Sequence, residues 1–163
     1  MTLDLTTFTG IHTVLSLVAL VAGVVVVIGL LGARTLPLMT ALFLVTAVAT
    51  SVTGFGFPFS TLLPSHYVGA ISLVVLALVI LARYVYGLSG AWRWIYAVGT
   101  VIASYFLVFV GIAQLFKKVP ALAAVAPTLS ETPFAATQGV VLVLFVVLAI
   151  AALRAFRPDA AMA

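Results

Sequence analysis

Residues 11–33 read IHTVLSLVALVAGVVVVIGLLGA and contain no Asp, Glu, Lys or Arg. A helix needs roughly 20 apolar residues to cross the hydrocarbon core of a bilayer, which is about 30 Å thick. The apolar residues are continuous rather than alternating, so the stretch does not have the pattern of a strand in a membrane barrel. It is therefore predicted to be a transmembrane helix.

Four more apolar stretches of similar length follow, at residues 36–57, 66–86, 92–116 and 133–156. The connection 117–132 contains Pro120 and Pro127, which argue against a further span and leave room only for a short helix. We therefore expect an all-α, integral membrane bundle of about five transmembrane helices, forming a single domain over residues 1–163.

The composition supports this class of protein. Hydrophobic residues make up 66% of the chain and charged residues 6%, which leaves too little polar surface for a soluble globule. The net charge of +4 is scattered and forms no patch that would bind nucleic acid. The chain has no cysteine, so disulfides and thiolate metal sites are excluded. The first ten residues carry Asp4 and no cation, unlike a cleaved signal peptide, so we expect the first helix to be retained.

The cations predict an orientation. With five spans, all the arginines fall on one side of the membrane and both lysines on the other: Arg34, Arg83, Arg93, Arg154 and Arg157 against Lys117 and Lys118. Cytoplasmic loops carry the excess of Lys and Arg. This predicts an N-terminus outside and a C-terminus in the cytoplasm.

Most of the unusual polar groups fall on the predicted outer side. His12 and His66 each lie near the start of a helix that runs inward, so they are expected at similar depth and could approach each other. Polar groups that converge beneath an aromatic rim are typical of a small-molecule site. The predicted ligand-binding residues are His12, Thr53, Phe55, Phe57, His66, Gln114 and Gln138.

Such an outer-leaflet pocket would suit an apolar or amphiphilic ligand: a lipid, a quinone or haem. Two histidines on neighbouring helices could supply both axial ligands of a haem. A metal ion held by His12, His66 and Glu131 is a weaker variant, since Glu131 could instead pair with Lys117 or Lys118.

Catalysis is not indicated. The only acids are Asp4, Glu131 and Asp159, none of them in a predicted span, and no nucleophile or phosphate-loop motif is present. Two other functions stay open. The protein could be an accessory or scaffolding subunit that packs against a membrane-protein partner, or it could associate with itself as a channel lined by Thr46, Thr50 and Thr53. Threonines in membrane helices more commonly bond to their own backbone or to a neighbouring helix.

Four segments, TSVTGFGFPF (50–59), LPSHYVGAISL (63–73), GLSGAWRWIY (87–96) and APTLSETPF (126–134), resemble a group of small uncharacterised multi-span proteins of the bacterial inner membrane. Together they touch the second to fifth predicted helices. The resemblance implies a bacterial inner-membrane location and carries no activity, cofactor or catalytic residue.

Overall fold

The computed structural model describes residues 6–58 and 64–157, and within these ranges the chain is all-helical, with no strand. The elements in chain order are α1 (Phe8–Leu31), α2 (Pro37–Gly54), α3 (Pro64–Ile80), the π-helical turn η1 (Leu81–Val85), α4 (Trp92–Lys118), α5 (Pro120–Val125) and α6 (Thr132–Ala155). In the described residues five helices are long and apolar enough to cross a membrane: α1, α2, α3 with η1, α4 and α6. The predicted fold class and number of spans are confirmed.

The helix ends differ from the predicted ones by a few residues. Helix α1 begins at Phe8 rather than Ile11, where the Thr7 hydroxyl accepts a hydrogen bond from the Gly10 N–H. Helix α2 ends at Gly54, three residues before the predicted end. The chain continues there as Gly56-Phe57-Pro58, and the residue before a proline disfavours the helical conformation. The connection after α4 contains the short helix α5, as expected.

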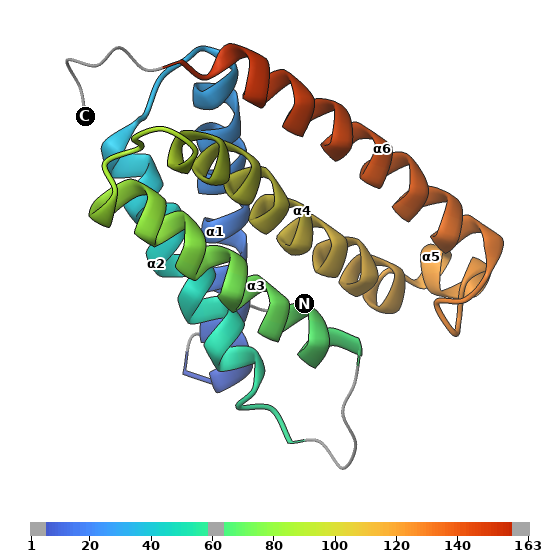
Figure 1. Ribbon diagram of the computed structural model, residues 1–163. Helices are drawn as coiled ribbons and strands as arrows, with labels where there is room; N and C mark the ends of the chain where they lie inside the picture. Colours follow the sequence, from blue (N-terminus) through green and yellow to red (C-terminus); the bar gives the residue numbers. More distant parts are fainter. Residues whose placement is uncertain (1–5, 59–63, 158–163) are drawn as a thin grey trace.

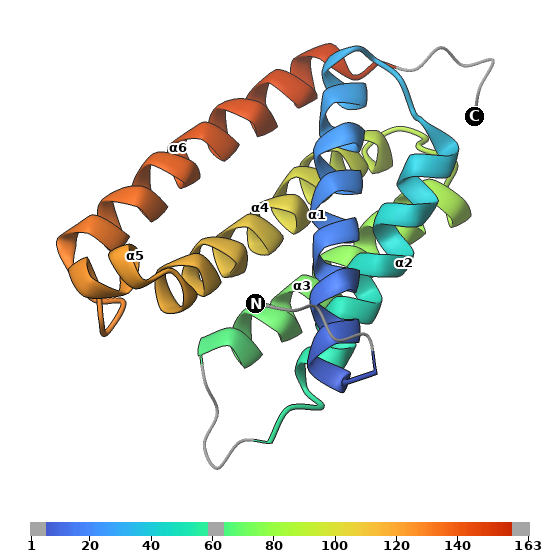
Figure 2. The same ribbon diagram turned by 180° about the vertical axis from the view of Figure 1, so that it is seen from behind.

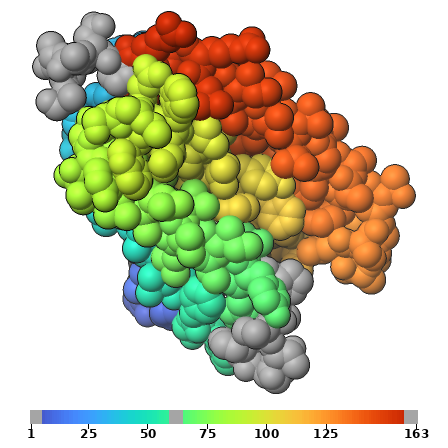
Figure 3. Space-filling model, in the orientation of Figure 1, coloured from blue at the N-terminus to red at the C-terminus, as the bar shows by residue number. Residues whose placement is uncertain are grey.

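Helices α1, α2 and α3 form one group, and α4 joins this group to α6 (Figures 1 and 2). Each of the pairs α1 and α2, α2 and α3, α3 and α4, and α4 and α6 is in contact, and α4 also packs on α1. Helix α6 lies along one edge of the molecule (Figure 3) and is the least buried of the five long helices. Its broad outward face is available to lipid or to another membrane protein.

The core lies where α4 passes the first three helices. It contains small and branched residues from α1 with larger side chains from α2, α3 and α4, such as Phe43, Leu76 and Tyr96, all fully buried. Gly23 allows α1 and α4 to approach closely, because a Cβ atom there would lie 2.9 Å from the Ser104 Oγ. Close approach at small residues is a usual way for membrane helices to associate.

The two ends of the bundle carry different cations. The α1–α2 connection, the turn between η1 and α4, and the C-terminal end of α6 lie at one end, with all the described arginines (Figure 1). Lys117 and Lys118 lie in the last turn of α4, at the other end. We call these the arginine end and the lysine end.

Candidate functional site

His12 and Thr53 join α1 to α2 at the lysine end. The His12 Nδ1 lies 2.8 Å from the Thr53 Oγ1, and the two residues are 41 positions apart in the chain. Both side chains are partly buried. The sequence placed both residues in the candidate site, and the structure brings them into direct contact.

The hydrogen bonds around Thr53 determine which nitrogen of His12 carries a proton. The Thr53 hydroxyl has a single proton, which it donates to the Ala49 carbonyl at 2.7 Å, with the Thr50 carbonyl at 3.2 Å. Its oxygen can therefore only accept from His12, so the proton of the neutral imidazole is on Nδ1. The Nε2 of neutral His12 then carries a lone pair, and within residues 6–58 and 64–157 it has no hydrogen-bond partner.

Phe57 packs on His12, and Phe8 packs on Phe57. The Phe57 ring lies edge-on to the imidazole, with ring centroids 5.0 Å apart and planes at 89°, and Phe8 packs edge-on against Phe57 at 5.0 Å. Gly56 makes room for Phe8, because a Cβ atom there would lie 2.7 Å from the Phe8 Cζ. Phe57 therefore packs directly on the imidazole of His12. Phe8 lies outside the predicted first span, which begins at residue 11, although it is four residues before His12 and so on the same helix face.

Lys117 and Lys118, in the last turn of α4, lie at the same end of the bundle as His12 and Thr53. The sequence allowed Glu131 to pair with Lys117 or Lys118, but among the described residues it forms no ion pair with either lysine. Its carboxylate instead accepts hydrogen bonds from the Thr128 hydroxyl at 2.7 Å and from the Thr128 and Ser130 N–H groups at 3.1 Å.

His66 lies on a different side of α2. Its ring is 5.6 Å from that of Phe55 and is buried, with 7% of its surface exposed. Thr53 and Phe55 are two residues apart, which is about 200° around a helix axis. Thr53, in the last turn of α2, and Phe55, directly after the helix, thus point in nearly opposite directions. The end of α2 therefore separates the two histidines, which the sequence allowed to approach each other.

The two glutamines of the predicted site lie elsewhere. Gln138 of α6 is buried and donates from Nε2 to the Phe109 carbonyl of α4 at 3.0 Å, while its Oε1 has no partner among the described residues. A carbonyl can only accept, so the orientation of this amide is determined. Gln138 therefore joins α6 to α4. Gln114 is exposed near the end of α4. Neither forms a hydrogen bond to His12, Thr53 or His66 among the described residues.

The metal and haem hypotheses depended on the two histidines lying together. The part of the chain that the structure describes has no group of three or more His, Cys, Asp or Glu side chains that could hold a metal ion. Glu131 uses its carboxylate within its own turn, and α2 stands between His12 and His66. The Nε2 of His12 keeps the lone pair that an axial ligand would need.

Several hydroxyl groups in the helices bond to their own backbone. Thr46 donates to the Leu42 carbonyl at 2.7 Å, and Ser104 to the Thr100 carbonyl at 2.9 Å. Thr53 does the same with Ala49. Two of the three threonines suggested as a channel lining thus have their protons bound within α2, which is the structural role that the sequence favoured.

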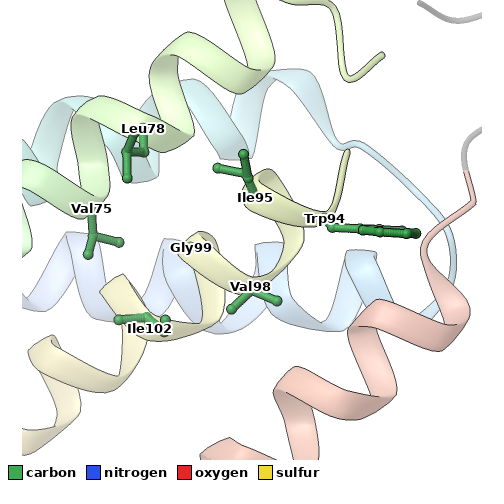
Figure 4. A pocket seen from close by; sticks show the side chains of 7 residues that line it. All are labelled: Val75, Leu78, Trp94, Ile95, Val98, Gly99 and Ile102. Carbon is green, nitrogen blue, oxygen red and sulfur yellow. The ribbon is translucent and has the colours of Figure 1, made fainter. Parts of the chain in front are cut away.

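Two apolar grooves lie away from these residues. One, of about 360 Å³, lies between α3 and α4 and is lined by Val75, Leu78, Trp94, Ile95, Val98, Gly99 and Ile102 (Figure 4). The other, of about 310 Å³, lies between α1 and α2 and is lined by Leu17, Val18, Val21, Ala22, Val25, Met39 and Leu42. Neither contains a residue of the predicted ligand site.

Comparison of the chain with protein-family models, with curated proteins and with solved structures finds no match.

Proposed function

We propose that this is a small multi-pass protein of the bacterial inner membrane that binds an amphiphilic molecule at the lysine end of its bundle, in the outer leaflet. The observation that carries the proposal is the hydrogen bond from His12 Nδ1 to Thr53, which holds the imidazole in one tautomer and leaves Nε2 as an acceptor. A site built from a fixed polar atom beneath aromatic side chains is typical of ligand pockets.

The chemistry of Nε2 restricts the class of ligand. A lone pair accepts a hydrogen bond, so the ligand should offer a hydroxyl donor close to an apolar body. A quinol meets this requirement, and so does a lipid with an uncharged hydroxyl headgroup. The quinone form of the same molecule has only acceptor oxygens and should bind less well. Phe8 and Phe57 would contact the apolar part.

The distribution of the cations supports an orientation in which the lysine end is outside. All five arginines belong to the helix ends and tail opposite Lys117 and Lys118, and membrane proteins keep their excess of Lys and Arg on the cytoplasmic side. The N-terminus then lies outside and the C-terminus in the cytoplasm.

Nitrogen-15 NMR of the histidines provides the test, because the chain has only His12 and His66. The protein is labelled with ¹⁵N-histidine, purified in detergent at about pH 8, where an ordinary imidazole is neutral, and titrated with a short-chain benzoquinol and, separately, with a monoacylglycerol. We expect the His12 Nε2 signal to shift and that of His66 to stay. The matching benzoquinone should bind about tenfold less tightly, the value of one hydrogen bond.

Two variants serve as controls. Thr53→Val removes the acceptor of Nδ1–H, so the tautomer preference and the affinity should fall together. Thr137→Val removes an exposed hydroxyl that bonds to its own helix and should change neither. If neither hydroxyl ligand shifts Nε2, the site does not bind this class of molecule. A Soret band in the purified protein that disappears in His12→Ala would instead identify haem as the ligand.

A second function has support from α6. Its outward side chains Val140, Val143 and Val147 are more than half exposed, and this is the least buried long helix. An accessory subunit would use such a face against a membrane partner. Photo-crosslinking from position 143 at native expression should then recover one stoichiometric partner protein, and recovery of lipid alone would contradict this role.

A further inference from the structure

The groove between α3 and α4 has a purely apolar lining (Figure 4). Val75 and Leu78 come from α3, and the other lining residues come from α4. Gly99 brings the two helices together at the floor, since a Cβ atom there would lie 2.6 Å from the Val79 Cγ2. The result is an apolar groove along the helix surface, which suits an acyl chain better than a polar group.

A cation and an indole lie where this groove meets the arginine end. Trp94 lines the groove and has 53% of its surface exposed, and the Arg93 guanidinium carbon lies 5.7 Å from the centre of the indole ring. Tryptophan at such a position is typical of the membrane interface, at the level of the lipid headgroups. The groove therefore extends from headgroup depth toward the middle of the membrane.

Arg93 has donor capacity that no described residue uses. Its Nε is buried and has no hydrogen-bond partner in the part of the chain that the structure describes. The single acid among the described residues is Glu131, which lies beyond the other end of α4. The half-buried guanidinium thus has no anionic partner among the described residues, and a phosphate oxygen could accept charge-assisted hydrogen bonds from its terminal N–H groups.

We infer that the groove between α3 and α4 is a binding site for an anionic phospholipid, with one acyl chain along the groove and the phosphate at Arg93. The charge on Arg93 selects the headgroup, and Trp94 contacts the glycerol region. This site is at the opposite end of the bundle from His12 and does not depend on the function proposed for that residue.

Brominated lipids test the site through Trp94. Trp92→Phe leaves Trp94 as the single tryptophan, because the chain has two. This variant is placed in phosphatidylcholine vesicles that contain a small fraction of a lipid with dibrominated acyl chains, either phosphatidylglycerol or phosphatidylcholine. We expect phosphatidylglycerol to quench Trp94 at roughly fivefold lower mole fraction, the preference that one arginine near the surface provides.

Variants in the same background separate the groove from general attraction to charge. Arg93→Gln should abolish the preference, and Arg93→Lys should retain most of it. Arg34→Gln removes an exposed arginine at the same end, outside the groove, and should leave the preference unchanged. Equal quenching by the two lipids would overturn the inference, as would an equal loss in Arg34→Gln. A second copy of the chain covering the groove would shield Trp94 from both lipids, which would also overturn it.

Discussion

The Tyr96 hydroxyl lies 3.1 Å from the Thr40 Oγ1, in the fully buried contact between α4 and α2. Thr40 donates its own proton to the Thr35 carbonyl at 2.8 Å, so Tyr96 must be the donor in this pair. The Phe156 ring packs on Tyr96 at 5.5 Å, and the Arg83 guanidinium carbon lies 5.8 Å from the Tyr96 ring centre. The hydrogen bonds from Tyr96 to Thr40 and from Thr40 to Thr35 therefore join α4, α2 and the α1–α2 connection near the arginine end.

The order of donors predicts unequal effects of removing each partner. Tyr96→Phe should lower the free energy of unfolding by about 1 kcal/mol, because Thr40 keeps its bond to Thr35. Thr40→Val should cost more, about 1–3 kcal/mol, because the buried Tyr96 hydroxyl loses its acceptor. The double variant should be more stable than Thr40→Val alone. Unfolding in mixed detergent measures all three, and Tyr67→Phe, at an exposed tyrosine, is the control.

Gly23 should not tolerate a side chain. Gly23→Ala would place Cβ 2.9 Å from the Ser104 Oγ and 3.0 Å from a carbon of the fully buried Phe43 ring, so α1 and α4 would have to separate. We expect a loss of about 1–3 kcal/mol in unfolding free energy, which is typical of overpacking. The matched control is Gly139→Ala in α6, where an added Cβ meets nothing within 4 Å. A Gly23→Ala protein as stable as the control would show that this close approach does not stabilise the bundle.

Glu131 should titrate below its ordinary pKa of 4.5. The Thr128 hydroxyl first, and then backbone N–H groups of the same turn, bond to the carboxylate and lower its pKa. Because the folded pKa is the lower one, the stabilisation of this turn is fully present above the ordinary value and is lost as the pH falls through the folded pKa. The amide signals of Thr128 and Ser130 should report this transition in an NMR titration. Glu131→Gln should abolish it, and a midpoint above 4.5 would contradict the hydrogen-bonded turn.

Single cysteines test the proposed orientation, because the chain has none of its own. Ala121→Cys lies on exposed α5 at the lysine end, and Ser89→Cys on the exposed turn at the arginine end. A maleimide that does not cross membranes should label position 121 in intact spheroplasts and position 89 only after lysis. The reverse pattern would show that the protein has the opposite orientation, with the His12 site in the inner leaflet.

Several features could be read from the sequence alone. The length and continuity of the apolar stretches determined the number of spans, because hydrocarbon offers no partner for an unpaired backbone group and a helix satisfies its own. Prolines and glycines marked the connections to within a few residues. The cations also divided between the two ends as expected, since the side of a residue depends only on how many spans come before it.

The contacts of the candidate site needed the tertiary structure. The spacing of Thr53 and Phe55 determines that they point to different sides of α2, since each residue turns the helix by about 100°. The sequence did not show that α1 lies on one of those sides and α3 on the other, so it allowed His12 and His66 to approach each other. Helix packing depends on how each helix is rotated about its own axis and on which neighbour it contacts. Those choices depend on side chains from several helices at once, such as Gly23 with Ser104 and Phe43, and so only the folded bundle decides them.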